Sequence, residues 1–190
     1  MTAVKMNLDH PLLPELKREF PDAGLFVTEF RGETTIVVPK ARCHDVLTFM
    51  HRDSRFAFDF LSDVIGIDYL NYPGQDSPAI AGRFAVVYRL IATSRNDRLF
   101  VKVFLEPSRE TTGIEDDPAL HLPSVCDLWA GAEWMEREVF DMFGVHFDNH
   151  PDLRRILTWE DYPAHPLRKD YPLRGRGERE TYRIIKRDSA

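Results

Sequence analysis

The sequence has little cysteine and none of the common cofactor motifs. Of its 190 residues, only Cys43 and Cys126 are cysteines, and no Cys-x-x-Cys pair is present. Two distant thiols cannot complete an iron–sulfur cluster or a typical structural zinc site. The chain also lacks Gly-x-Gly-x-x-Gly, Gly-x-x-x-x-Gly-Lys-Ser/Thr and Gly-x-Ser-x-Gly, the signatures of common nucleotide-binding and hydrolase folds. We expect this chain to hold no cofactor, no metal and no catalytic residue.

Long apolar runs are absent as well. A membrane-spanning helix needs about 18 or more apolar residues, and no stretch meets that length in a chain with a mean hydropathy of -0.35. The first residues do not form a basic stretch followed by an apolar one, so neither a secretory signal nor a transit peptide is expected. We expect that the chain does not cross a membrane and that it stays in the cytosolic compartment.

The histidines do not show a recognisable ligand spacing. His146 and His150 are four residues apart, but Gly144 and Pro151 bracket them and make a helix that would align them doubtful. The zinc interpretation is therefore disfavoured.

The hydrophobic content of 43% is sufficient for a real core, and 190 residues suit one domain. Apolar periodicity and Pro/Gly punctuation predict helices over 11–20 and 41–52, and strands over 25–30, 34–38, 60–70, 83–91 and 99–105. Helical material is predicted over 125–143, with Pro123 in a first turn. We expect an α+β fold with a mixed or antiparallel sheet and helices packed on one face, followed by an extended proline-punctuated C-terminal tail. The expected divisions are an α+β domain over 1–120, a helical connector over 121–144 and a partner-wrapping tail over 145–190.

The tail combines frequent proline with many apolar side chains. Its prolines disfavour helix and sheet, yet its aromatic and aliphatic content is too high for a solvated linker. We expect these side chains to be buried against another protein. Charge also divides the chain, because 145–190 carries ten basic and eight acidic residues while 1–144 carries 15 and 23.

The predicted helix over 133–143 places two carboxylates among apolar side chains. Glu136 and Glu138 fall on its apolar flanks, while Glu133, Arg137 and Asp141 form the predicted open face. A carboxylate in an apolar wall needs a cation, hydrogen-bond donors or a proton. We favour salt-bridged tail anchors, with Arg154 and Arg155 as partners, over general acid or base chemistry.

Three ordered blocks carry a family resemblance. EREVFDMFG (136–144), DNHPDLRRIL (148–157) and HPLRKDYPL (165–173) together resemble the C subunit of the bacterial proton-translocating NADH:quinone oxidoreductase, respiratory complex I. The resemblance covers essentially the whole chain. It implies a subunit without a redox centre in the quinone-reducing module of the peripheral arm, on the cytoplasmic side of the inner membrane. The assembled complex is then expected to use NADH, FMN, iron–sulfur clusters and quinone through other subunits.

The resemblance also implies that the tail wraps the D subunit of the complex, with the B and I subunits and other peripheral-arm subunits as further partners. Quinone would be contacted only indirectly. The residues expected at the partner interface lie in the three blocks: Glu136, Arg137, Glu138, Asp141, Phe143, Gly144, His150, Pro151, Asp152, Leu153, Arg154, Arg155, His165, Pro166, Leu167, Arg168, Lys169, Asp170, Tyr171 and Pro172.

Other functions stay open from the sequence. A nucleic-acid-binding protein could stack bases on aromatic residues of an Arg-rich tail, although a pI near 5.6 opposes this. A carboxylate-based hydrolase could use Glu136, Glu138 and Asp141, but no nucleophile or oxyanion motif accompanies them. A related membrane-bound hydrogenase-type complex would contain a homologous subunit, although DNHPDLRRIL followed by HPLRKDYPL looks closest to the NADH-type bacterial form.

Overall fold

A five-stranded mixed sheet forms the centre of the computed structural model, which describes residues 10–74 and 80–178. The strand order is β1-β2-β5-β4-β3, and all neighbours are antiparallel except β2 and β5, which run parallel. The predicted mixed sheet is confirmed. Its strands are β1 (Phe26–Phe30), β2 (Glu33–Val37), β3 (Phe60–Asp68), β4 (Phe84–Ala92) and β5 (Asp97–Leu105).

The strands form where apolar and polar residues alternate, and a tight turn joins the first two of them. In β5, Leu99, Val101 and Val103 are fully buried on one face, as the two-residue period predicts. Arg31 and Gly32 both have positive φ, 54° and 81°, which is the backbone that a two-residue hairpin turn between β1 and β2 requires.

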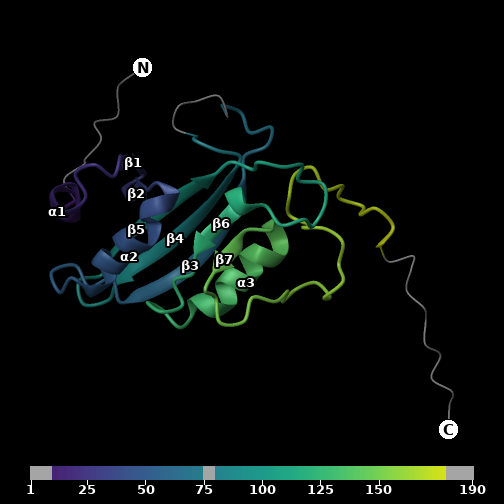
Figure 1. The fold of residues 1–190 in the computed structure, drawn as a ribbon. Helices are drawn as coiled ribbons and strands as arrows, with labels where there is room; N and C mark the ends of the chain where they lie inside the picture. The colour runs from purple at the N-terminus through teal and green to yellow at the C-terminus, as the bar shows by residue number, and fades with distance from the viewer. Residues whose placement is uncertain (1–9, 75–79, 179–190) are drawn as a thin grey trace, which may run out of the picture.

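The helices are α1 (Leu12–Glu19), α2 (Cys43–Arg52) and α3 (Ala132–Phe143), with short 3-10 turns over Lys40–Arg42 and Pro118–Leu120. Figure 1 shows α2 and α3 over the same face of the sheet. On the opposite face Phe26 and Phe60 are each 51% exposed. Helices on one face of the sheet are therefore confirmed. The longest described helix has 12 residues, and no described helix is long and apolar enough to cross a membrane.

The expectation of helix from residue 121 is wrong in its first part. His121–Pro123 is a short strand, β6, which pairs in parallel with β7 (His146–Asp148). Pro123 therefore ends a strand instead of starting a helix, because a two-stranded ribbon has only edges and tolerates a residue without an N–H. Turns follow, and α3 begins only at Ala132.

The C-terminal tail is irregular but is not detached from the domain. Residues 149–177 form only turns and irregular backbone, as the prolines predict. However, Val145, Phe147, Tyr162 and Ala164 are buried within the chain itself. The expectation that the apolar side chains of the tail are buried against another protein is therefore wrong for part of the tail. Residues 179–190 of the predicted tail lie outside the described residues.

Candidate partner interface

The open face of α3 differs from the prediction. Trp134 is 58% exposed and Glu138 is exposed, whereas Glu136, Arg137 and Asp141 are buried. The expectation that Arg137 and Asp141 face solvent is wrong because the segment 154–168 lies against that side of the helix. Trp134 and Glu138 are left for any contact that α3 makes with a partner.

Asp141 is the residue that anchors the tail. Its carboxylate accepts hydrogen bonds from Arg155 Nη1 at 2.7 Å, from the Thr158 hydroxyl at 2.5 Å and from three successive amides, those of residues 156–158, at 2.8 to 3.0 Å. Burial alone would raise the pKa of Asp141, but the bonds from Thr158 and Arg155 outweigh it and lower the pKa to about 2. Because both oxygens of this carboxylate already accept several hydrogen bonds, Asp141 stabilises the local structure and is unsuited to acid or base catalysis.

The tail also caps the C-terminal end of α3. The last carbonyls of a helix have no partner within it. Here His165 Nδ1 lies 2.9 Å from the Asp141 carbonyl, the Leu167 amide donates to Met142 and Arg168 Nε donates to Phe143 at 2.7 Å. A cation at this end also suits the helix dipole.

Gly144 makes this close approach possible. It ends α3 with φ 73°, and a Cβ at this position would collide with the guanidinium of Arg168 and with the ring of His165. The predicted helix stop is therefore confirmed. Gly66 in β3 likewise allows α3 to lie close to the sheet, because a Cβ there would collide with the ring of Phe143.

A second anchor ties the tail to the sheet. Asp68 on β3 accepts from the Lys169 amide at 2.8 Å and from Arg83, and Arg83 also donates to Asp170 at 2.9 Å. The Thr111 hydroxyl donates to the same Asp170 oxygen at 2.5 Å. Residues 165–171 are thus part of the folded domain.

Glu136 occupies a pocket made by the turn after β6. It accepts from the Ser124 hydroxyl at 2.7 Å and from the Val125 amide at 2.8 Å, with Cys126 Sγ at 3.6 Å. Burial raises the pKa of Glu136 to about 7 despite these hydrogen bonds. The predicted pairing of Glu136 with Arg154 or Arg155 is wrong, because Arg154 binds Asp152 and Arg155 binds Asp141.

The remaining expected residues divide by exposure. The His150 side chain is fully buried and binds the Glu133 carbonyl at 3.0 Å, and Leu153 packs against the core. Pro151 and Arg154 are exposed, and Leu167 is 54% exposed. Three more of them line a groove, described next: Pro166, Tyr171 and Pro172.

This surface, called here the tail groove, is formed by residues 157–178 of the tail and has apolar and polar side chains in its lining. It is a depression of about 570 Å³ whose apolar and aromatic lining comprises Leu157, Trp159, Tyr162, Pro166, Tyr171, Pro172 and Leu173. Leu157 is 63% exposed and Leu173 is fully exposed. The Tyr162 and Tyr171 hydroxyls lie 2.6 Å apart, and Trp159 packs edge-on against Tyr162 at 4.5 Å between centroids, so one wall of the groove is held in place.

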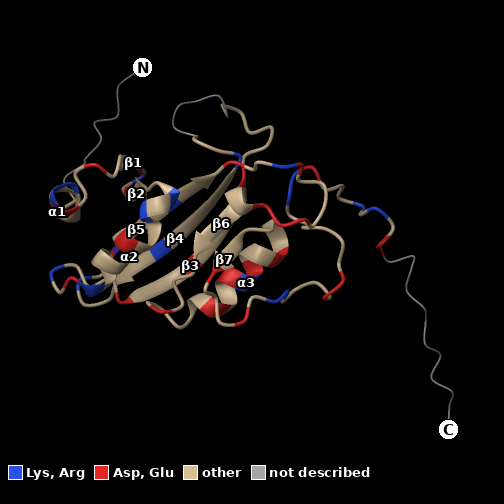
Figure 2. Ribbon diagram, in the orientation of Figure 1, with Lys and Arg blue, Asp and Glu red and all other residues tan. Residues whose placement is uncertain are grey.

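The charges around this region do not form a basic strip. Figure 2 shows Lys and Arg interspersed with Asp and Glu along the tail, and residues 149–178 contain six basic and five acidic side chains. Binding to nucleic acid usually requires a strongly basic face. The described tail lacks that property.

The sequence does not reveal which hydroxyl groups donate hydrogen bonds to the buried carboxylates. Ser124, Thr158 and Thr111 are short polar residues far from their partners in sequence, and no local pattern marks them. Leu157 and Leu173 also lie outside the set of residues expected at the interface. Both do belong to the apolar side chains of the tail that the sequence predicts to be buried against another protein.

Comparisons with known proteins agree on one family. The family model described as respiratory-chain NADH dehydrogenase, 30 Kd subunit, matches residues 36–177. The C subunit of NADH-quinone oxidoreductase from Citrifermentans bemidjiense is 43% identical over 169 residues, which cover 89% of this chain and 92% of that relative. The C subunit from Thermus thermophilus is 42% identical over 175 residues, covering 88% of this chain and 73% of that protein.

Solved structures support the same assignment. The trypsin-resistant fragment (1-134) of Nqo5, in its P63 form, is 35% identical with a TM-score of 0.57, covering 74% of this chain and 98% of the fragment. The membrane-bound sulfane sulfur reductase, an archaeal respiratory membrane complex, contains a chain with a TM-score of 0.64, covering 95% of this chain and 96% of that one. Its identity of 22% shows a shared fold alone. The chain belongs to the respiratory-chain NADH dehydrogenase 30 kDa subunit family and is a subunit of an NADH-quinone oxidoreductase.

Proposed function

We propose that the chain is a non-redox scaffold subunit of the peripheral arm, in the quinone-reducing module, and that it binds the D subunit of the complex through the tail groove. The observation that carries this proposal is a surface of exposed apolar side chains on the tail, whose backbone is anchored to the domain as far as Tyr171. Leu157 and Leu173 are open to water, while Asp141 and Asp68 hold the neighbouring amides. An exposed apolar patch beside a groove is typical of a protein interface.

A fixed backbone favours binding. Ordering a flexible segment on association costs free energy, and a surface that is already ordered avoids most of that cost. The hydrogen bonds of Asp141 and Arg168 hold the groove walls before any partner arrives. Burying the apolar side chains then contributes about 25 cal/mol for each Å² removed from water.

The thiols support a role without redox chemistry. Burial raises the pKa of Cys43 to about 12 and that of Cys126 to about 11. Thiolates, not thiols, bind metals and react as nucleophiles. The two thiols are therefore poor ligands for an iron–sulfur cluster, and we propose that the clusters, like NADH, FMN and quinone, are bound by other subunits of the complex.

As a scaffold, the chain would affect quinone reduction by fixing the position of the D subunit. Fixing the D subunit beside the B and I subunits would hold a quinone site that this chain does not line, and a misplacement of about 1 Å can slow a reaction about 100-fold. The chain would associate with the inner membrane peripherally, on the cytoplasmic side, through the complex. The Nqo5 fragment spans 74% of this chain, so a quarter of the chain lies outside what trypsin spared in that relative.

The test is a binding measurement with the purified D subunit. The double variant Leu157→Ser/Leu173→Ser should weaken the complex at least about tenfold, because both side chains are exposed and their loss removes apolar contact area. Phe30→Ser is the matched control, since Phe30 is 73% exposed on β1 at the far edge of the sheet. Equal affinity of the double variant and the wild type would contradict the proposed interface.

A further inference from the structure

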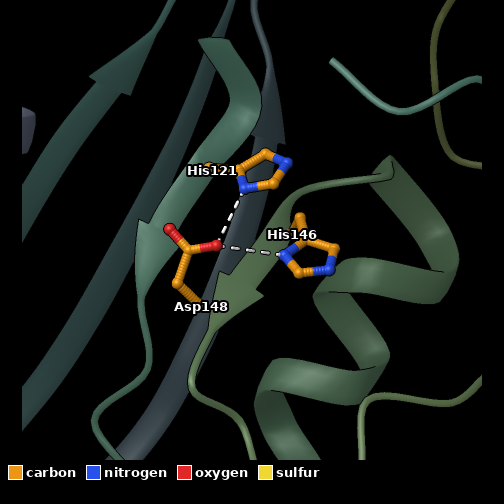
Figure 3. Close-up of side chains that lie close together, drawn as sticks. All are labelled: His121, His146 and Asp148. Atoms are coloured by element: carbon orange, nitrogen blue, oxygen red, sulfur yellow. Dashed lines mark hydrogen bonds and ion pairs between the residues drawn. The ribbon is translucent and has the colours of Figure 1, made fainter. Parts of the chain in front are cut away.

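The β6–β7 ribbon gathers two histidines and a carboxylate on one face. Parallel pairing puts His121 opposite His146, and the two-residue period of β7 puts Asp148 on the same side as His146. Figure 3 shows the two imidazoles turned toward one oxygen of Asp148. His121 Nδ1 lies 2.8 Å from Asp148 Oδ1, and His146 Nδ1 lies 3.4 Å from the same atom.

These separations suit a transition-metal ion. Zinc binds imidazole nitrogen and carboxylate oxygen at about 2.0–2.2 Å, so tetrahedral ligand atoms lie about 3.3–3.6 Å apart. The ligand atoms of His121, His146 and Asp148 all lie within 4.8 Å of one another. The two imidazole rings are stacked, with centroids 4.3 Å apart and planes at 16°, so one ring would turn, together with the Asp148 carboxylate, to bring all three ligand atoms to one ion.

Two further observations point to a ligand. The Nδ1 atom of His146 is buried and makes no hydrogen bond within the described residues, and its ion-pair contact with Asp148 Oδ1 is as long as 3.4 Å. His121 Nε2 lies 2.8 Å from Asp116 Oδ1. That contact would keep a ring proton of His121 on Nε2, the carboxylate–histidine arrangement that orients metal-binding imidazoles. His121 Nδ1 lies 2.8 Å from Asp148 Oδ1, so an ion would replace the proton between these two atoms.

The site is also accessible and has a suitable charge. The side chains of His121, His146 and Asp148 are 22%, 39% and 48% exposed, which allows an ion to enter and leaves room for water as a fourth ligand. The carboxylates of Asp116 and Asp148 offset the charge of a divalent ion. Two imidazoles favour Zn²⁺ and similar ions over Mg²⁺ or Ca²⁺, which prefer oxygen ligands.

A second group of ligand-type side chains fits a metal less well. Cys126, Glu136 and His150 also lie together, but both oxygens of Glu136 already accept hydrogen bonds and His150 Nε2 already contacts the Glu133 carbonyl. Binding an ion there would require breaking these contacts in a buried place.

We propose that His121, His146 and Asp148 bind one divalent transition-metal ion, with Zn²⁺ as the best match. This proposal departs from the expectation that the chain holds no metal, because the pairing of β6 with β7, which no sequence pattern shows, brings His146 to His121. The ion would join β6 to β7 and so close the loop that contains α3. This proposal does not depend on the binding of the D subunit.

The test is titration of the full, untagged, metal-stripped chain with ZnCl₂ by calorimetry near neutral pH. We expect one ion per chain in the wild type, and at least a tenfold loss of affinity in His121→Ala and His146→Ala, with folding checked by circular dichroism. Zinc should also raise the Tm of the wild type but not of these variants, because a ligand stabilises the state that binds it.

His44→Ala is the matched control, since His44 pairs with Asp127 at 3.0 Å without a second histidine. It should bind zinc as the wild type does. Cys126→Ser tests the second group and should also leave binding unchanged. Loss of binding in Cys126→Ser but not in His146→Ala, or no saturable one-to-one binding in the wild type, would overturn the proposal.

Discussion

At the scale of single residues, Glu136 makes the stability of the domain depend on pH. Burial raises its pKa from 4.5 to about 7 in the folded chain. Between these values the unfolded chain has lost the proton and the folded chain still holds it. Stability from this residue is therefore fully present below about pH 4.5 and is lost as the pH rises through 7.

Glu136→Gln should remove this loss. A glutamine can accept from the Val125 amide and donate to the Ser124 oxygen, so the pocket keeps its contacts. At pH 8 we expect the variant to be more stable than the wild type by about 3 kcal/mol, since each pKa unit corresponds to about 1.4 kcal/mol. Urea unfolding at pH 5 and pH 8 measures this difference. Parallel pH profiles for the two proteins would show that Glu136 ionises freely in the fold.

The sequence predicts which residues of α3 share a face but not what covers each face. The placement of Glu136 in an apolar wall, and its need for donors, are confirmed. Asp141 looks solvated in the sequence because its partners begin 14 residues further along the chain. Helical periodicity contains no information on such distant contacts, so the tail anchor is Asp141 instead of Glu136, and both carboxylates are buried.

At the scale of elements, α3 and the tail depend on one another. The helix gains partners for its last three carbonyls, and the tail gains an anchor for the amides of residues 156–158. Each satisfies polar backbone groups that would otherwise be costly to bury. This exchange explains how an irregular, proline-rich segment can be folded without forming a helix or a strand.

Asp141→Asn should break this coupling. The amide can replace an oxygen acceptor only on one side and loses the charge that faces Arg155 Nη1 at 2.7 Å. Removing one partner of a buried ion pair typically costs about 3–5 kcal/mol. The control is Asp152→Asn, whose pair with Arg154 is exposed and should matter by less than about 1 kcal/mol. Chemical unfolding of both variants gives the comparison, and equal losses would refute the anchoring role of Asp141.

The elements themselves are predictable where a long pattern exists. The observed strands over 60–68, 84–92 and 97–105 follow from the predicted apolar runs over 60–70, 83–91 and 99–105, which are bounded by turns. The β6–β7 ribbon is not predictable in this way, because three residues are too few to show a two-residue period and Pro123 resembles a helix start. Its pairing joins segments 25 residues apart in register, which only the tertiary structure determines.

At the scale of the whole molecule, the tail has two parts with different environments. As far as Tyr171 it is pinned to α3 and the sheet, and beyond it the exposed residues Leu173 and Arg174 follow. The sequence argument that apolar residues without regular structure need a foreign surface treats the tail as uniform. Hydrogen bonds between side chains and backbone allow the first part to fold against this chain's own domain. Only the exposed apolar residues of the tail groove then need a partner to bury them.

This division predicts the order of trypsin cleavage. In the isolated chain, cuts should appear first after Arg174 and Arg176, which are exposed, and much later after Arg155, whose neighbouring amides are held by Asp141. Proteolysis of a folded segment requires local opening, and anchored backbone opens rarely. Asp141→Asn should therefore accelerate the cut after Arg155 but leave the rate at Arg174 unchanged.

The D subunit should slow cleavage after Arg174, which lines the tail groove, because the bound partner would cover it. Mass spectrometry of the fragments over time, with and without that partner, follows all of these sites in one experiment. Early cleavage after Arg155 in the wild type would mean that the first part of the tail is not anchored in solution. Unchanged cleavage after Arg174 in the complex would place the partner on another surface, and the anchored fold of the tail would stand without the proposed interface.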